Sequence, residues 1–200
     1  MKIAIIDYNA GNVQSVIYAL NRLNVSPVLT NDIETLQSAD KVIFPGVGEA
    51  SSCMKSLKEA GLDQVIPQLK QPFLGICIGL QLMCSHSEEG DTDCLGVFPL
   101  KVKKFNKKNE EGEIFKVPHM GWNTIKSLDS PLFNTIQEDA YVYYVHSFYA
   151  ELSDEFTTAT STYVNTYSAA LQKDNFHAVQ FHPEKSGEKG SSILKNFLDL

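Results

Sequence analysis

Short apolar runs alternate with helical periodicity along the first half of the chain. The run from Ile3 to Tyr8 predicts a buried strand, and the apolar positions between Val13 and Leu23 recur at the spacing of an amphipathic helix. The same pattern predicts further strands over residues 25–29, 41–44 and 73–76, and helices over residues 51–70, with a break at Gly61, and 78–84. Strands and helices in alternation are typical of a mostly parallel sheet covered by helices. We therefore expect an α/β sandwich.

The second half of the chain has a different pattern. Strand-like segments, joined by short turns, cover residues 95–105, 114–117, 141–149, 156–164 and 169–172, which favours largely antiparallel pairing. A charge-dense stretch of mixed sign, residues 101–113, predicts a solvated hairpin tip, with a partner-binding role as the alternative. Apolar positions at helical spacing predict an amphipathic helix over residues 191–200. Neither a repeat nor a linker interrupts the sequence, so we expect a single domain over residues 1–200.

Composition narrows the possible functions. Two hundred residues with 43% hydrophobic content suit one domain, and the net charge of -7 argues against nucleic-acid binding, which requires clustered Lys and Arg. The N-terminus lacks the pattern of a signal peptide and its apolar run is too short to span a membrane, so we expect a cytoplasmic protein. The four cysteines form no C-x-x-C pair, which argues against a zinc site or a dithiol redox centre. Because the negative net charge argues against a nucleic-acid ligand, we expect a small-molecule substrate.

A cysteine framed by glycines is the most specific chemical feature. In Gly75-Ile76-Cys77-Ile78-Gly79, the glycines lie two residues before and two residues after the cysteine. This spacing lets a strand turn sharply into a helix and presents the central side chain beside backbone N–H groups, as in a nucleophile elbow. A free cysteine is also often a small buried core residue. The glycine spacing alone does not decide between a nucleophile and a core residue.

A histidine and a glutamate near the C-terminus favour the nucleophile. His182-Pro183-Glu184 follows a stretch that predicts a strand. An ordinary thiol, with a pKa of about 8.5, is mostly protonated at neutral pH, so a catalytic cysteine needs a base and a carboxylate that orients this base. Side chains two residues apart in extended backbone point to the same side, so we expect His182 and Glu184 to converge beside Cys77. The sequence thus predicts a catalytic triad.

The other histidines and a second glycine pair are less specific. His86 and His177 have no suggestive neighbours, His119 falls in a Pro/Gly-rich stretch that predicts a loop, and His146 lies in an aromatic strand where a structural role is favoured. Pro45-Gly46-Val47-Gly48 lacks the Gly-Lys-Ser/Thr of a Walker motif. It is either an ordinary tight turn or a loop that brings backbone N–H groups close to a ligand at the sheet edge.

Together, Pro45–Gly48, Gly75–Gln81 and His182–Glu184 resemble the motifs of the class I (triad) glutamine amidotransferases. Within that class the chain is most similar to the glutaminase subunits of imidazole glycerol phosphate synthase, through residues 7–12, residues 118–123 and Lys185-Ser186. The resemblance covers essentially the whole chain. It implies a flavodoxin-like sandwich whose mixed, mostly parallel sheet has an additional antiparallel portion. It also implies hydrolysis of L-glutamine to L-glutamate and ammonia, without metal or organic cofactor, and transfer of the ammonia to a (β/α)8-barrel cyclase subunit (HisF-type) in a heterodimer.

The resemblance also implies a role for individual residues. Cys77 attacks the glutamine side-chain amide, His182 moves the proton and Glu184 orients His182. The N–H of Ile78 binds the oxyanion, joined after a backbone rearrangement by an N–H of the loop Gly46, Val47 and Gly48. The residues that match substrate-binding positions are Gly46, Gln81 and, through their backbone, Ser147 and Phe148. The residues that match positions at the synthase interface are Asn12, Trp122, Tyr143 and Lys185.

Four alternatives stay open from the sequence. Trp122 is either a docking residue or a core anchor. The acceptor of the ammonia is either the cyclase of histidine biosynthesis or a synthase that aminates a sugar or nucleotide-sugar. A stand-alone thiol hydrolase of the same fold would need no synthase, although Gln81 and Glu184 argue against it. A non-enzymatic scaffold would not need Cys77, His182 and Glu184 together.

Overall fold

A computed structural model describes residues 1–8 and 13–200 of the chain. The helices are α1 (Val13–Arg22), α2 (Ile33–Gln37), α3 (Ala50–Glu59), α4 (Leu62–Val65), α5 (Ile78–Met83) and α6 (Gly187–Asp199). The strands are β1 (Ile3–Ile6), β2 (Val28–Thr30), β3 (Lys41–Phe44), β4 (Phe73–Ile76), β5 (His86–Ser87), β6 (Thr92–Asp93), β7 (Lys101–Lys104), β8 (His119–Ile125), β9 (Ala140–His146), β10 (Phe148–Ala150), β11 (Thr157–Thr162), β12 (Thr166–Lys173) and β13 (Phe176–Val179). Short 3-10 helices are η1 (Ile66–Gln68), η2 (Pro131–Phe133) and η3 (Pro183–Lys185).

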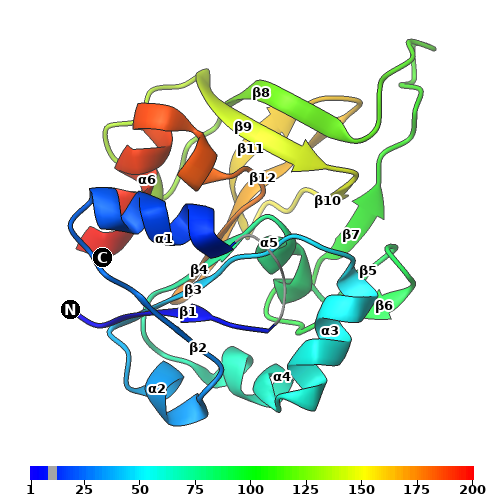
Figure 1. Ribbon diagram of the computed structural model, residues 1–200. Coiled ribbons are helices and arrows are strands. Elements are labelled where there is room, and N and C mark those ends of the chain that lie inside the picture. Colours follow the sequence, from blue (N-terminus) through cyan, green and yellow to red (C-terminus); the bar gives the residue numbers. More distant parts are fainter. Residues whose placement is uncertain (9–12) are drawn as a thin grey trace.

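One large sheet joins both halves of the chain. Its strand order is β2-β1-β3-β4-β13-β12-β10-β7-β5-β6, with β11 paired to β12 (Figure 1). The five strands from β2 to β13 are parallel, and the strands from β13 through β12 and β10 to β7 are antiparallel. Strands β8 and β9 form a separate antiparallel pair. The structure confirms the expected α/β fold, with a parallel portion extended by an antiparallel one.

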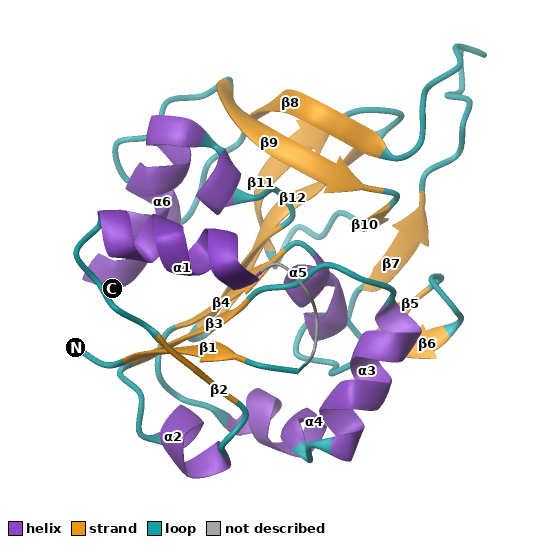
Figure 2. Ribbon diagram, in the orientation of Figure 1, coloured by secondary structure: helices purple, strands orange, loops and turns teal. Residues whose placement is uncertain are grey.

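Helices cover both faces of the parallel strands. In β1, Ile3 and Ile5 pack into one apolar cluster with residues of α1 and α6, whereas Ala4 and Ile6 pack into the opposite cluster with residues of α3 and α4. Side chains alternate between the faces of a strand, so a strand covered on both sides is apolar at every position. Figure 2 shows the resulting layers, with α1 and α6 on one side of the parallel strands and α2, α3 and α4 on the other.

The carboxyl ends of three neighbouring parallel strands bring the predicted motifs together. β3 ends before the loop that starts at Pro45, β4 ends before Cys77, and β13 ends three residues before His182. In an open α/β sheet, ligands bind at this edge. Elements distant in sequence therefore meet at one place in the fold.

The predictions for the first half agree closely with the structure. Strands β3 and β4 have the expected bounds, and the predicted helix over residues 51–70 is interrupted at Gly61, which has a φ of 70°. The strand predicted over residues 25–29 begins only at Val28. Pro27 precedes it, and proline lacks the N–H that a parallel strand needs for pairing.

Several predictions for the second half were wrong. Of residues 95–105 only Lys101–Lys104 form a strand, since the N–H groups of Leu95 and Phe98 bind carbonyls at the end of α5. Residues 114–117 form no named strand. Residues 119–125, expected in part as a loop, form β8, because pairing with β9 outweighs their Pro/Gly-rich context. The segment 141–149 is divided at Ser147 into β9 and β10, and α6 begins at Gly187, earlier than predicted.

Candidate active site

Cys77 occupies the sharp turn between β4 and α5. Its φ of 55° and ψ of -108° are unusual for a residue with a Cβ, and its backbone N–H donates to the carbonyl of Val179 over 2.8 Å. The flanking glycines serve another purpose than the turn itself. A Cβ on Gly79 would occupy the position of the Phe44 carbonyl, and a Cβ on Gly75 would lie 2.6 Å from the sulfur of Met83. Cys77 therefore carries the backbone strain of a nucleophile elbow, while the glycines allow close packing around it.

His182 and Glu184 form a buried hydrogen-bonded pair. Nδ1 of His182 lies 2.8 Å from Oε1 of Glu184, and the two side chains are only 2% and 3% exposed. The expectation of extended backbone was wrong, because residues 183–185 form the 3-10 helix η3 with His182 as its N-cap. Pro183 explains the difference: its fixed φ suits the first position of a helix. The pair nevertheless converges as predicted.

The surroundings of His182 favour its protonated form. Burial lowers the pKa of His182, but the neighbouring Cys77 and the contact with Glu184 outweigh burial and raise this pKa to about 10. Nε2 of His182 is buried and makes no hydrogen bond among the described residues. With Nδ1 held by Glu184, Nε2 is the nitrogen free to exchange a proton with the Cys77 sulfur. The arrangement can therefore hold a thiolate–imidazolium pair.

A cavity of about 260 Å³ opens beside the elbow. Seven of the predicted residues line it: Val47, Gly48, Cys77, Ile78, Gln81, Ser147 and Phe148. Gly46 lies just outside, where the hydroxyl of Tyr8 occupies the space that a Cβ would need. This hydroxyl donates to the carbonyl of Pro45 over 2.8 Å and thereby holds the start of the glycine loop. The loop is a wall of the cavity as well as a turn.

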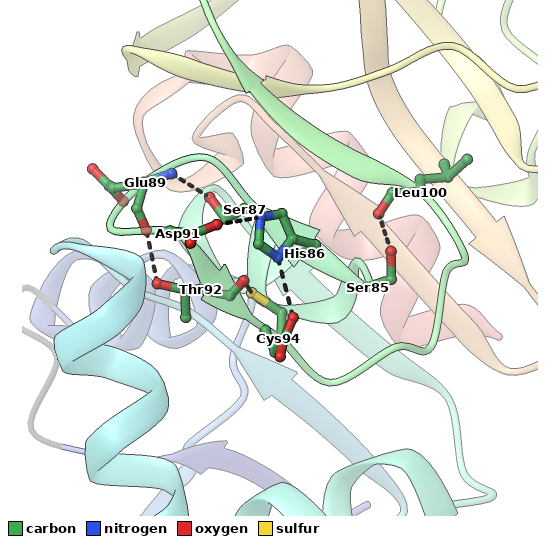
Figure 3. A network of polar contacts seen from close by, with 9 residues as sticks. Ser85, His86, Ser87, Glu89, Asp91, Thr92, Cys94 and Leu100 are labelled. Atoms are coloured by element: carbon green, nitrogen blue, oxygen red, sulfur yellow. Dashed lines mark hydrogen bonds and ion pairs between the residues drawn. The ribbon is translucent and has the colours of Figure 1, made fainter.

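Glu89 is a charged residue that lines this cavity and was not predicted from the sequence. It lies in the turn between β5 and β6, where its backbone N–H donates to Ser87 Oγ over 3.1 Å and its carbonyl accepts from Thr92 over 2.8 Å (Figure 3). His86 braces the same hairpin through Asp91 and Asp93. Burial raises the pKa of Glu89, although its carboxylate accepts the N–H of Ala50. The Gly90-Asp91 turn signals a hairpin, but no local signal brings it to the elbow.

His146 also lines the cavity and is held as a neutral ring. Its Nδ1 lies 2.7 Å from the Phe148 carbonyl, and its Nε2 lies 3.1 Å from Nδ1 of His119. Because a carbonyl can only accept, the proton of His146 is on Nδ1. Burial lowers the pKa of His146 to about 3 and that of His119 to about 4. These histidines therefore act as neutral hydrogen-bonding groups at ordinary pH.

The predicted interface residues lie in two places. Trp122 and Tyr143 lie on the antiparallel pair β8 and β9, called the outer hairpin below, and Lys185 lies beside His182 and Glu184. Trp122 on β8 is 55% exposed and contacts Tyr143 on β9 edge to face, with ring centroids 5.9 Å apart. The exposure of Trp122 argues against a core anchor. Lys185 ends η3, directly after Glu184. Asn12 lies outside the described residues.

The described part of the chain offers neither a metal centre nor a membrane span. Within residues 1–8 and 13–200, no group of three or more His, Cys, Asp or Glu side chains is arranged to hold a metal ion. No described helix is long and apolar enough to cross a membrane. The described cysteines are free thiols, and only Cys94 among them is partly exposed.

Comparison with known proteins gives matches over the full chain. The family model for glutamine amidotransferase class-I matches residues 4–200. Imidazole glycerol phosphate synthase subunits HisH from Bacteroides fragilis strain YCH46 and from Bacteroides thetaiotaomicron are 60% and 58% identical, each with 100% of both chains covered. The HisH subunit from Idiomarina loihiensis is 43% identical and covers 100% of this chain and 98% of its own. The structure of a glutamine amidotransferase from Thermotoga maritima superimposes with a TM-score of 0.62 at 18% identity, covering 100% of this chain and 83% of that chain, which shows the fold alone.

A family match over nearly the whole chain agrees with the geometry around Cys77, and the chain belongs to the class I glutamine amidotransferases. Within this family, the relatives named above share 43–60% of their residues with it over full length. The chain belongs with these HisH subunits of imidazole glycerol phosphate synthase.

Proposed function

We propose that the chain is the glutaminase subunit of imidazole glycerol phosphate synthase. It hydrolyses L-glutamine to L-glutamate and ammonia and passes the ammonia to a (β/α)8-barrel cyclase subunit of the HisF type. That subunit uses the ammonia to form imidazole glycerol phosphate and the carboxamide nucleotide AICAR in histidine biosynthesis. Full-length identity of 60% to a HisH subunit supports this assignment. The cytoplasmic location expected from the sequence stays a prediction.

The observation that supports the proposal most directly is a cavity that is lined by Cys77 and lies beside the buried pair of His182 and Glu184. In the proposed reaction the Cys77 thiolate attacks the side-chain amide carbon of glutamine, and the N–H of Ile78 stabilises the oxyanion. His182 gives its Nε2 proton to the departing ammonia, leaving a glutamyl thioester. Water then attacks the thioester with His182 as base, which releases glutamate and restores the thiol. Glu184 holds the imidazole throughout.

Polar groups of the cavity suit the α-amino group of glutamine. Gln81 uses both amide hydrogens, one on the Phe148 carbonyl and one on Gln180, each over 3.0 Å. Its oxygen is therefore an acceptor, which suits an ammonium group, and the carboxylate of Glu89 adds a negative charge. The Phe148 carbonyl already accepts from Gln81 and His146, so its lone pairs are filled. We assign the α-amino group to Gln81 and Glu89, and leave the backbone N–H groups of Ser147 and Phe148 for the α-carboxylate.

The outer hairpin offers a surface for the barrel subunit. Met120, Trp122 and Tyr141 are 64%, 55% and 60% exposed, and exposed apolar side chains gathered on one element are typical of protein interfaces. The same hairpin is bonded to the triad, because the N–H of His182 donates to the Tyr143 carbonyl over 2.8 Å. Docking at this hairpin can thus alter the backbone that carries His182.

Glutamate release tests the proposal. The full chain is assayed alone and with a HisF-type barrel subunit plus its nucleotide ligand, alongside Cys77→Ala and the matched control Cys94→Ala. We expect slow release by the chain alone and strong stimulation by the partner, lost in Cys77→Ala and kept in Cys94→Ala. Absence of stimulation would contradict the assigned partner, and fast release by the chain alone would instead indicate a stand-alone hydrolase.

A further inference from the structure

Gln180 is a fully buried polar residue beside the nucleophile. Parallel pairing of β13 with β4 sets Val179 opposite Ile76, so the next residue on each strand, Gln180 and Cys77, are neighbours. Nε2 of Gln180 lies 3.7 Å from Sγ of Cys77, and its Oε1 lies 3.0 Å from Nε2 of Gln81. The exposed fraction of Gln180 is 0%. A buried amide makes hydrogen bonds to compensate its desolvation, and here one of these is to the reacting sulfur.

One backbone carbonyl fixes the direction of this hydrogen-bond chain. The Phe148 backbone carbonyl can only accept, so Gln81 must turn its NH2 group toward it. The second hydrogen of that NH2 group then points to Gln180, whose side-chain oxygen must accept it. The NH2 group of Gln180 is thereby left facing Cys77. The orientation of the Gln180 amide, with its NH2 group toward the sulfur, therefore follows from the hydrogen bonds of Gln81 and is not an arbitrary choice.

The sulfur also faces an acceptor. Sγ of Cys77 lies 3.9 Å from the carbonyl of Val145, to which a protonated thiol can donate. A thiolate has no hydrogen to donate and gains nothing from that carbonyl, whereas the NH2 group of Gln180 is a donor that stabilises negative charge. The two contacts therefore favour opposite protonation states of the thiol.

We propose that Gln180 stabilises the Cys77 thiolate by donating a hydrogen bond to it, and that it couples this donor to the substrate-recognition residue Gln81. The proposal rests on the proposed function in that Cys77 is taken as the nucleophile. It adds to the triad a residue that touches the reacting sulfur. Removal of the donor leaves the Val145 carbonyl as a neighbour that disfavours the thiolate.

Alkylation of Cys77 by iodoacetamide tests the proposal without substrate. The rate is followed on the full chain between pH 5 and 10 by mass spectrometry of the Cys77 peptide, in wild type, Gln180→Met and Gln180→Glu. Methionine keeps the length of the side chain and removes the donor, and the carboxylate of glutamate adds a like charge. Gln172→Met is the matched control, because Gln172 is on β12 and its oxygen accepts from Ser130.

We expect the pH of half-maximal alkylation to rise by about one unit in Gln180→Met, so that the rate at pH values well below the wild-type midpoint falls about tenfold. The shift should be at least as large in Gln180→Glu and absent in Gln172→Met. Unchanged pH profiles in both Gln180 variants, with only a lower melting temperature, would overturn the proposal and leave Gln180 a packing residue. Should wild type release no glutamate with the barrel subunit, the proposed function fails separately, because the alkylation profile needs no glutamine.

Discussion

Replacement of His146 by asparagine should reduce the amount of unfolding free energy that is lost when the pH falls from 7 to 5. Burial lowers the pKa of His146 to about 3 in the folded chain, whereas an unfolded histidine has a pKa of about 6.5. Between these values the unfolded state binds a proton that the native state does not, so stability falls as the pH falls. Asparagine does not titrate, and its NH2 group can replace Nδ1 as donor to the Phe148 carbonyl.

The magnitude follows from the two pKa values. Between pH 7 and pH 5, His146 alone should remove about 2 kcal/mol from the free energy of unfolding. Burial also lowers the pKa of His119 and of His177 to about 4, so these two histidines add to the loss of stability in the same pH range. A typical domain is stable by about 5–15 kcal/mol, so the effect is large. His182 has the opposite sign: its stabilising contribution is fully present below its unfolded pKa and is lost as the pH rises through about 10.

Urea unfolding at pH 7 and pH 5, followed by far-ultraviolet circular dichroism, measures the effect. We expect the loss of unfolding free energy between the two pH values to be about 2 kcal/mol smaller in His146→Asn than in wild type. Tyr167→Phe is the matched control, since it removes a hydroxyl that lies 3.3 Å from Nε2 of His146 and does not titrate between pH 5 and pH 7. It should lower stability at both pH values and keep the wild-type difference. An equal loss in His146→Asn and wild type would refute the reasoning.

Three further predictions concern the triad, the elbow and the outer hairpin. Glu184→Gln should lower partner-stimulated glutamate release by about 10³–10⁴-fold with little change in the Michaelis constant, because the amide no longer holds the imidazole for proton transfer; a loss below tenfold would contradict this role. Gly79→Ala should lower the melting temperature and abolish activity, since its Cβ would displace the Phe44 carbonyl. The control Gly96→Ala has open space around the new Cβ and only a strained φ, so it should lower the melting temperature less and stay active. Trp122→Ala should weaken binding to the barrel subunit in calorimetry at an unchanged melting temperature, and unaltered affinity would exclude Trp122 from the interface.

The strands that form the parallel portion could be predicted because they are buried on both faces. β3 and β4 are short apolar runs bounded by turn residues, and such runs need no knowledge of their neighbours. β8 was missed because its residues become a strand only by pairing with β9. The stretch over residues 95–100 was overpredicted because its apolar residues are buried under α5 without sheet pairing.

The convergence of His182 and Glu184 could be predicted from chemistry, but not the rest of the surroundings of Cys77. Cys77, His182 and Glu184 have residue types and spacings that suit nucleophilic catalysis. Glu89 and Gln180 carry no such local signal: the first reaches the cavity through the β5–β6 hairpin, and the second reaches Cys77 through the pairing of β13 with β4. Both contacts depend on which strands become neighbours, and that is a property of the whole sheet.

Covalent labelling of the chain in complex with its barrel subunit tests the central claim, that Cys77 is the nucleophile of a glutamine-binding cavity. The complex is incubated with a chloroketone analogue of glutamine, with and without excess L-glutamine, and the labelled peptide is identified by mass spectrometry. We expect one adduct, on Cys77, that glutamine suppresses and that Cys77→Ala abolishes. An adduct on Cys94, or labelling of Cys77 that glutamine does not suppress, would contradict this claim.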